Sequence, residues 1–390
     1  MPTPETVLNR LENFIEREDW QGYDPYDGLN SSFLRFLTFN GKWSRIAVTQ
    51  AMKRSPINLR PVLGIDKMRN PKAMGLLARA YIERYRRKKN QRYLSQIREI
   101  LDWLISNSSP GFTGYAWGYN FDWQSAVFYV PKGTPTIVNT SFIANAFLDG
   151  YKILKEKTYL DVARSSCDFV LDDLNRTSHD EKVCFSYSPA DKLCVHNANL
   201  LGAELLARVY SITREESLLA QAKRAVDFTL AYQNPNGSWY YGILPRQKYV
   251  DSFHTGFVLV SLFNIINYTN TTNNSEYTRI LLKGYEYYKK TFFDDNGMPY
   301  YYHDKTYPID LHCSAQGIIT FLKFDDYDHY AIKTAKKIAT WAIDNMWDDK
   351  KGYFYFQKTK YFFNKIPYLR WPNAWMFYAL ANYPDFAYRS

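Results

Sequence analysis

The sequence predicts an all-α fold, an (α/α)6 toroid of six helical hairpins, and three observations support this. First, a loop with one polar or ionisable residue precedes an apolar, helix-like stretch again and again along the 390 residues. Second, the polar residues recur regularly, 57 residues from Asn139 to His196 and then 58 at each step to His254, His312 and Arg370. Third, each unit holds one helical pattern that is apolar all round and one that is amphipathic, which predicts concentric inner and outer rings.

The N-terminal part precedes the regular units. Residues 4–19 have helical spacing and are expected to form a capping helix, and the loop GYDPYDGLN (22–30) contains Asp-Pro and Asp-Gly turn signals. Ile57–Pro61 forms a rigid loop, and repeat units start near residue 57. We expect residues 1–390 to form a single toroid domain, with early helices at 31–38, 43–53, 70–88 and 91–106.

Each later unit begins with a short aromatic segment that suggests a small β-hairpin, at 114–117, 183–187, 238–241, 299–302 and 352–356. An apolar inner helix follows in each unit, at 142–151, 200–210, 257–266, 318–324 and 375–380. The amphipathic outer helices are expected at 161–174, 216–232, 276–292 and 329–346. Asn70, before the helix at 73–88, supplies a sixth unit, with an extended loop within 111–135. The inner-helix N-termini and the hairpins are expected to form one funnel-shaped mouth.

The recurring polar residues are candidates for a shared pocket at that mouth. Helix N-termini carry unsatisfied N–H groups and a partial positive charge, which suit anions. Asparagine is a common N-cap, so Asn70 and Asn139 could be caps and nothing more. Histidine and arginine are not preferred caps, and His196, His254, His312 and Arg370 therefore indicate a binding or catalytic purpose.

Two Asp–His pairs are the candidate acid/base groups. Asp251 lies three residues before His254 and Asp310 two residues before His312, so each carboxylate could orient the nearby imidazole. Three tyrosines on the expected hairpins could donate a proton or stack on a sugar: Tyr187, Tyr241 and Tyr302. All of these residues could also be structural.

The candidate substrate-binding residues are arginines, carboxylates and aromatic or amide groups in the repeat loops. Arg60 and Arg370 each lie in a proline-containing loop, where a fixed guanidinium could bind a carboxylate bidentately. Asp24 and Asp27 could cap a helix or act as a glycosidic carboxylate pair. The remaining candidates are Asn139, His196, Asn197, Trp239 and Trp371.

Composition favours an acidic partner. The net charge is +10, the sequence pI is about 9.1 and 18% of the residues are aromatic, which suits an acidic sugar held in an aromatic cleft. A basic cluster between Arg84 and Arg92 fits a solvated helix end or a contact with an anionic membrane. No zinc-finger or RNP-type motif is present, so nucleic acid is not an expected partner.

Several other classes are not supported. The four cysteines form no CxxC, which favours a reducing compartment, and neither a signal peptide nor an apolar stretch of roughly 18 residues is evident. A zinc site could combine Asp310, His312 and Cys313 with Cys194 or His196, but this spacing matches no zinc motif. We expect no metal or cofactor, and a cytoplasmic protein that is at most peripheral to a membrane.

The sequence resembles a family encoded in prokaryotic glycan-assembly clusters, whose members are often mislabelled as delta-aminolevulinic acid dehydratases. That family is similar to the six-hairpin toroids of unsaturated glucuronyl hydrolases and to the α/α domain of glucuronyl C5-epimerases. True dehydratases are TIM barrels with catalytic lysines, and nothing here supports that fold. The resemblance spans nearly the whole chain, through GYDPYDGLN (22–30), INLRP (57–61), GTPTIVNTSF (133–142), VHNANLLGAELLARVY (195–210), NGSWYYG (236–242), DSFHTGF (251–257), HCSAQGIIT (312–320) and RWPNAWMFYALA (370–381).

This resemblance implies a substrate that is a glycan containing uronic acid, often lipid-linked. It implies acid/base chemistry of the epimerase, lyase or hydrolase type, although no aspartate here matches the hydrolase catalytic residue by motif. One alternative is a non-catalytic glycan-binding or assembly factor on the same fold. Another is a membrane-surface partner of a glycosyltransferase complex.

Overall fold

The computed structural model describes residues 2–125, 129–270 and 275–383. Six inner helices form a closed ring in which each packs on the next and the last packs on the first. The predicted (α/α)6 toroid is therefore confirmed. The inner helices are α4 (Pro71–Lys88), α6 (Ile137–Leu154), α8 (His196–Thr213), α10 (Ser252–Tyr268), α12 (Leu311–Lys323) and α14 (Ala374–Asn382).

The outer helices each pack on the inner helix that precedes them in the chain, with one exception. The five regular ones are α5 (Gln91–Ser106), α7 (Lys157–Asp168), α9 (Glu216–Leu230), α11 (Ser275–Thr291) and α13 (Ala331–Met346). The sixth outer position is taken by α1 (Pro4–Arg17), which packs on α14 and α13. The segment that was expected to cap the fold is thus half of the sixth hairpin, and the first and last helices meet.

The inner helices begin earlier than their apolar pattern suggested, and in α4, α6, α10 and α12 a side chain of the polar loop caps the first turn. The Asp251 carboxylate accepts the backbone N–H of His254 at 3.0 Å, and the Asp310 carboxylate accepts that of His312 at 2.9 Å. Asn70 caps α4 in the same way, whereas Thr136, not Asn139, caps α6. These caps satisfy N–H groups that would otherwise be buried without partners.

Two of the five expected hairpins are present as strand pairs, β3 (Arg176–His179) with β4 (Lys182–Phe185) and β6 (Trp347–Asp348) with β7 (Tyr353–Phe354). The other three aromatic segments form loops with no named strand. In two of them a buried tryptophan packs on an outer helix instead, since the Trp117 indole donates to the Leu104 carbonyl at 2.8 Å and the Trp239 indole to that of Thr229 at 3.0 Å. Further short strands are β1 (Trp123–Gln124), β2 (Tyr129–Val130), β5 (Ile309–Asp310), β8 (Gln357–Lys358) and β9 (Phe363–Asn364).

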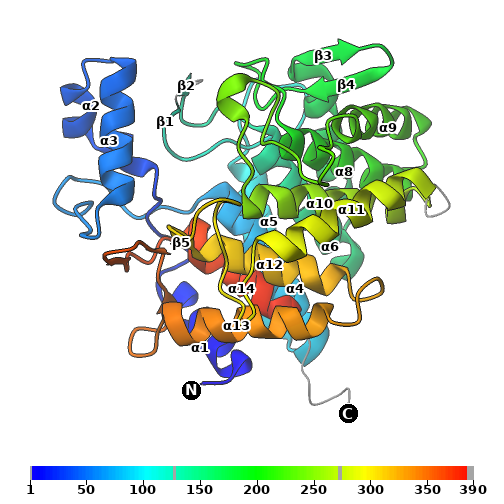
Figure 1. Ribbon diagram of the computed structural model, residues 1–390. Helices are drawn as coiled ribbons and strands as arrows, with labels where there is room; N and C mark the ends of the chain where they lie inside the picture. The colour runs from blue at the N-terminus through cyan, green and yellow to red at the C-terminus, as the bar shows by residue number, and fades with distance from the viewer. Residues whose placement is uncertain (1, 126–128, 271–274, 384–390) are drawn as a thin grey trace.

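One helical hairpin lies outside the ring. The helices α2 (Ser32–Leu37) and α3 (Lys42–Arg54) stand apart from the toroid in Figure 1. The helix α3 contacts the 3-10 turn η1 (Asp27–Asn30) and β1. In the described part of the chain, no helix is both long and apolar enough to cross a membrane.

The basic cluster at residues 84–92 binds α1 to the ring. Arg84 is buried and its guanidinium pairs with Glu12 and Glu5 of α1, both at 2.9 Å. Arg92 also pairs with Glu12. The exposed Arg86 pairs only locally, with Glu83, at 2.5 Å. Part of this positive charge is therefore neutralised within the fold.

Replacing Arg84 by alanine should destabilise the protein, because Glu12 would lose its main buried partner. We expect the free energy of unfolding to fall by about 3 kcal/mol. Arg86→Ala, on the same helix but 40% exposed at its side chain, should change it by no more than about 0.5 kcal/mol. Urea denaturation of both variants measures the difference, and equal effects would contradict a structural role for Arg84.

Candidate functional site

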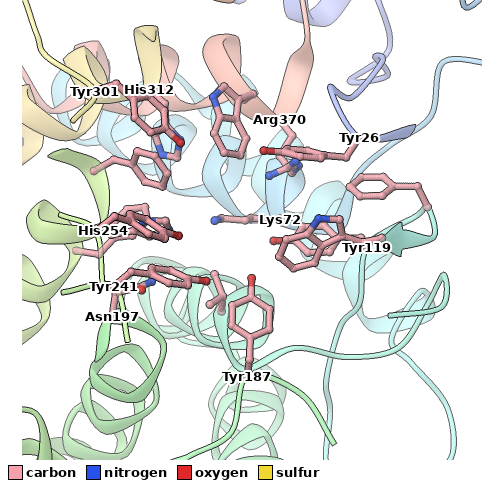
Figure 2. A pocket seen from close by; sticks show the side chains of 17 residues that line it. Tyr26, Lys72, Tyr119, Tyr187, Asn197, Tyr241, His254, Tyr301, His312 and Arg370 are labelled. Carbon is pink, nitrogen blue, oxygen red and sulfur yellow. The ribbon is translucent and has the colours of Figure 1, made fainter. Parts of the chain in front are cut away.

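A pocket lies at the end of the ring where the inner helices begin (Figure 2). It encloses about 760 Å³ of space free of protein atoms, part of it open to solvent. The first turn of each inner helix, or the turn η5 (Leu369–Asn373) that leads into α14, contributes a lining residue. These residues are Lys72, Val138, Asn197, His254, His312 and Arg370.

Aromatic side chains form most of the pocket wall. Six of them are tyrosines, and Figure 2 shows Tyr26, Tyr119, Tyr187, Tyr241 and Tyr301 around the cavity. Such rings present a flat apolar face together with a hydroxyl, which suits a sugar ring and its substituents. The full aromatic set is Tyr26, Tyr119, Phe121, Trp123, Tyr187, Tyr241, Tyr249, Phe253, Phe257, Tyr301 and Trp371.

Seven of the candidate residues from the sequence line this pocket: Tyr187, Asn197, Tyr241, His254, His312, Arg370 and Trp371. Asn139 and His196 do not, although the neighbouring Val138 and Asn197 do. Each residue of an α-helix is turned by roughly 100° from the one before it, so an error of one position aims the side chain elsewhere. The 57- to 58-residue repeat located the helix starts but not the helical phase in these two units.

The other candidates lie behind or beside the pocket. Tyr302 is outside the lining, and the adjacent Tyr301 takes that place. Trp239 is buried and, with His196 and Asp251, lines a smaller cavity next to His254. The remaining candidates, which are outside both cavities, are Asp24, Asp27, Arg60, Asn139 and Asp310.

His254 is held by Asp251 in an orientation that suits a general base. Nδ1 of His254 lies 2.6 Å from one Asp251 carboxylate oxygen, and the other oxygen caps the helix through the His254 backbone N–H. With Nδ1 donating to the carboxylate, Nε2 carries the lone pair and is the nitrogen that remains for a ligand. The N-cap residue and the residue three positions later lie on the same face of the first helical turn, so the carboxylate and the imidazole are close enough to pair.

His312 differs from that arrangement, and the expectation that Asp310 orients its ring is wrong. The Asp310 carboxylate accepts hydrogen bonds from the His312 backbone, from the Trp371 indole at 2.9 Å and from Gln357. A spacing of two residues turns the imidazole away from the cap. The ring instead stacks on Phe253, with centroids 4.6 Å apart, and neither nitrogen has a hydrogen-bond partner within the described residues.

The His312 imidazole is neutral at physiological pH. Burial lowers the pKa of His312 well below its usual value, and the nearby positive charge of Lys72 lowers it further. A neutral imidazole offers one donor and one acceptor. Because both are unsatisfied next to the cavity, they are available to a bound ligand.

Lys72, which the sequence analysis missed, occupies the bottom of the pocket. Its ammonium lies over the rings of Phe142, Trp375 and Phe257, at 4.5, 5.4 and 5.6 Å from their centroids. No carboxylate of the described residues forms an ion pair with it. Burial lowers the pKa of Lys72 well below its usual value, and Arg370 lowers it further. The sequence did hold a signal, because a lysine directly after Asn70-Pro71 precedes a stretch, residues 73–78, that has no charged or polar side chain.

Two buried arginines are fixed by the 22–30 loop. Arg370 donates Nη2 to the Asp24 carboxylate at 2.8 Å and Nε to its other oxygen, and Arg60 donates Nε to Asp27 at 2.6 Å. Burial raises the pKa of Asp27 to about 6 despite the Arg60 charge. Arg370 reaches the pocket, whereas Arg60 stacks on Tyr368 outside it. Asp24 and Asp27 thus hold cations in place.

The electrostatics of the pocket favour an anion. Its 17 lining residues include one lysine, one arginine and two histidines, and none of these described residues is aspartate or glutamate. The converging helix N-termini add partial positive charge. No group of three His, Cys, Asp or Glu side chains suited to a metal ion occurs in the parts of the chain that the structure describes.

Comparison with known proteins shows similarity to solved carbohydrate-active toroids. One is a cellobiose 2-epimerase from Bacillus thermoamylovorans B4167, 13% identical, with a TM-score of 0.63 over 80% of this chain and 87% of that one. A GH76 alpha-mannanase of Bacteroides thetaiotaomicron is 14% identical, with a TM-score of 0.62 over 80% and 86%. An unsaturated glucuronyl hydrolase specific for heparin is 11% identical, with a TM-score of 0.65 over 97% and 95%.

No protein-family model matches the sequence, and no curated protein matches it. At the identities above, the likeness establishes the fold, which this chain shares with carbohydrate-active epimerases, isomerases and glycoside hydrolases. The expected similarity to the toroids of unsaturated glucuronyl hydrolases is confirmed at the level of the fold. Membership of the glycan-cluster family and a uronic-acid substrate stay predictions.

The buried His196 should make the protein sensitive to acid. Its ring packs against Tyr232 and Phe228, and burial lowers the pKa of His196 from 6.5 to about 4. Between these values the unfolded chain binds a proton that the folded chain does not. Stability is therefore lost as the pH falls from about 6.5 to 4, by up to about 3 kcal/mol for this group.

The measurement is urea denaturation of wild type and His196→Asn between pH 7 and pH 4. We expect the wild type to lose stability faster on acidification, because the variant lacks the titrating group. His329→Asn, in an exposed turn, is the control and should follow the wild type. Parallel curves for wild type and His196→Asn would contradict this prediction, because they would mean that His196 binds its proton equally well in the folded and the unfolded chain.

Proposed function

We propose that this protein is a carbohydrate-active enzyme that removes the proton from the carbon next to the carboxylate of a uronic acid, as an epimerase or a lyase. The observation that supports this most directly is the composition of the pocket. An oriented imidazole, His254, stands in the same cavity as two cations, Lys72 and Arg370, and the described lining holds no carboxylate. Cations attract the substrate carboxylate, and the imidazole accepts the proton.

In the proposed reaction the uronate carboxylate lies toward Lys72 and Arg370, and the hydrogen on C5 faces Nε2 of His254. The proton passes to Nε2, and the electron pair of the C–H bond moves onto the carboxylate as an enediolate. Arg370 stabilises the added negative charge, and Lys72 does so as well, because the uronate carboxylate beside it favours its charged form and opposes the lowering of its pKa by burial. Arg370 is held for this by Asp24, and Lys72 has no competing carboxylate among the described residues.

Two outcomes are open to the enediolate. If a tyrosine hydroxyl returns a proton to C5 from the opposite face, the product is the C5 epimer. If the C4–O bond breaks instead, the electron pair forms a C4–C5 double bond and the departing oxygen takes the tyrosine proton. Tyr187 and Tyr241 are the candidate donors, since burial raises the pKa of both hydroxyls and keeps them protonated.

Glycoside hydrolysis has weaker support from this pocket. A hydrolase of the common type needs two carboxyl groups about 5 to 9.5 Å apart on either side of the bond. The nearby carboxylates of Asp24, Asp251 and Asp310 are engaged with Arg370, His254 and Trp371. The epimerases among the similar structures show that this fold accommodates sugar epimerisation.

Solvent deuterium distinguishes the proposal from its alternatives. In deuterated buffer, we expect uronic-acid oligosaccharides incubated with the protein either to gain deuterium at C5, if they are epimerised, or to be cleaved with a C4–C5 double bond, if they undergo elimination, as measured by mass spectrometry and NMR. The same oligosaccharides with their carboxylates reduced to alcohols should gain none, because the enediolate cannot form. Cleavage without deuterium or a double bond would indicate a hydrolase, and binding without either change would indicate a glycan-binding factor.

Substitution of the Asp251–His254 pair separates the base from the residue that positions it. His254→Gln should lower kcat at least about 100-fold, because the proton acceptor is lost. Asp251→Asn keeps an N-cap for α10 but no longer holds the ring as a charged acceptor. We expect kcat to fall at least about tenfold with KM within about threefold, since an unaligned base slows proton transfer more than binding.

The control for both variants is His329→Gln, on the opposite end of the ring from the pocket, which should retain wild-type kcat. Thermal unfolding of each variant checks that the fold persists. If Asp251→Asn reduced stability without changing kcat, its role would be that of a helix cap alone.

A further inference from the structure

The α2–α3 hairpin is strongly basic. Between Gly28 and Ile65 the chain contains no aspartate or glutamate. Among the ion pairs of the described chain, Arg60 is the only basic residue of the segment 28–65 with a carboxylate partner, the buried Asp27. The segment carries six positive residues: Arg35, Lys42, Arg45, Lys53, Arg54 and Arg60.

The same hairpin exposes large apolar side chains. Phe33, Phe36, Phe39 and Trp43 are 61%, 71%, 81% and 71% exposed, and α2 has no buried residue at all. Phe33 and Phe36 lie three residues apart on one helix face, and the Phe36 and Phe39 rings are 5.9 Å apart. Contiguous exposed apolar surface of this kind marks an interaction site.

The turn between the two helices presents these side chains at a conformational cost. Phe39 and Asn40 both have left-handed backbone conformations, with φ of 45° and 57°. This region is uncommon for a bulky residue and costs free energy. Burial of the Phe39 ring does not offset that cost, because the ring points into solvent.

The hairpin stands beside the pocket. Lys53 of α3 donates to the hydroxyl of Tyr26, a pocket residue, at 2.7 Å. Arg45 of α3 lies over the ring of Tyr129 in β2, at 4.3 Å from its centroid. The helix also contacts β1, which carries the pocket residue Trp123. The hairpin is therefore in direct contact with the wall of the pocket.

We propose that the α2–α3 hairpin docks this protein on a membrane surface that contains anionic phospholipid. Its aromatic side chains enter the headgroup region, and its lysines and arginines pair with lipid phosphates. A membrane fits better than a protein partner. A hairpin that bound a protein surface of mixed charge would be expected to carry acidic as well as basic residues, and this hairpin carries no acidic residue. The basic cluster at 84–92 is less suited to this contact, since α1 already neutralises part of it.

Docking in this way brings the substrate into reach. A glycan attached to a membrane lipid would be held next to the pocket, so the substrate class becomes a lipid-linked acidic glycan. This extension rests on the proposed function. The docking itself does not, because membrane binding is measured without any turnover.

The test is flotation of the full-length protein with large unilamellar vesicles, of phosphatidylcholine alone or of phosphatidylcholine with phosphatidylglycerol in a ratio of about 3:1. We expect wild type to float with the anionic vesicles at low salt and to be released from them at high salt. Its binding to vesicles of phosphatidylcholine alone should be more than about tenfold weaker. The Phe36→Ser, Phe39→Ser, Trp43→Ser variant should bind at least about tenfold more weakly. The charge-reversed variant Arg35→Glu, Lys42→Glu, Arg54→Glu should lose binding as well.

The matched control reverses three exposed charges elsewhere, Arg86→Glu, Lys88→Glu and Lys89→Glu, and should bind the vesicles within about twofold of wild type. Circular dichroism verifies that each variant is folded. The proposal is overturned if wild type does not float with the anionic vesicles, or if the control loses binding while the hairpin variants keep it. A wild-type dimer that becomes monomeric in the serine variant, with no vesicle binding, would show that a second copy covers the hairpin.

Discussion

The buried ion pair between Asp24 and Arg370 joins two segments that lie 346 residues apart in the chain. Taking either charge out of water without the other would cost several kcal/mol, so each requires its partner. The pair fixes the 22–30 loop against the turn that leads into α14, and Arg60 with Asp27 reinforces the contact. Through that loop the same interaction positions Tyr26 in the pocket wall and α3 beside it. The last inner helix thus organises the part of the site that comes from the first residues of the chain.

The carboxylates around the site hold other groups in place while the cavity itself stays positive. Asp24 holds Arg370, and Asp251 holds the His254 imidazole. Lys72 is different, because its desolvation is offset by aromatic rings and by the charge of Asp24, without an ion pair in the described structure. A buried cation without a carboxylate lowers the stability of the fold, and such strongly perturbed groups are typical of functional sites.

The repeat predicted the toroid and the inner and outer helices well, because a helix buried on all sides must be apolar all round. The interval from Asp251 to His254 also predicted an Asp–His pair that forms, whereas the pair predicted from Asp310 and His312 does not. Other features depend on three-dimensional contacts that spacing does not encode. The pairing of α1 with α14 joins opposite ends of the chain, and the phase of α6 places Val138 rather than Asn139 at the cavity. Lys72 was not predicted because it lies in the one unit whose spacing departs from the repeat. The exposure of α2 was not predicted because it depends on how the ring packs, and α2 is not part of the ring.

The aromatic floor beneath Lys72 determines how any ligand can pass through this molecule. Phe142, Phe257 and Trp375 lie 5.2 to 5.4 Å from one another and separate the pocket from a second cavity deeper in the ring. The toroid is therefore a blind well and not a tunnel, so a long polymer cannot thread through it. A ligand must enter and leave by the same opening, and only the part of it that fits into this well can reach Lys72. For the glycan proposed as substrate, the sugar that reacts must reach into this well, while the rest of the molecule stays at the mouth.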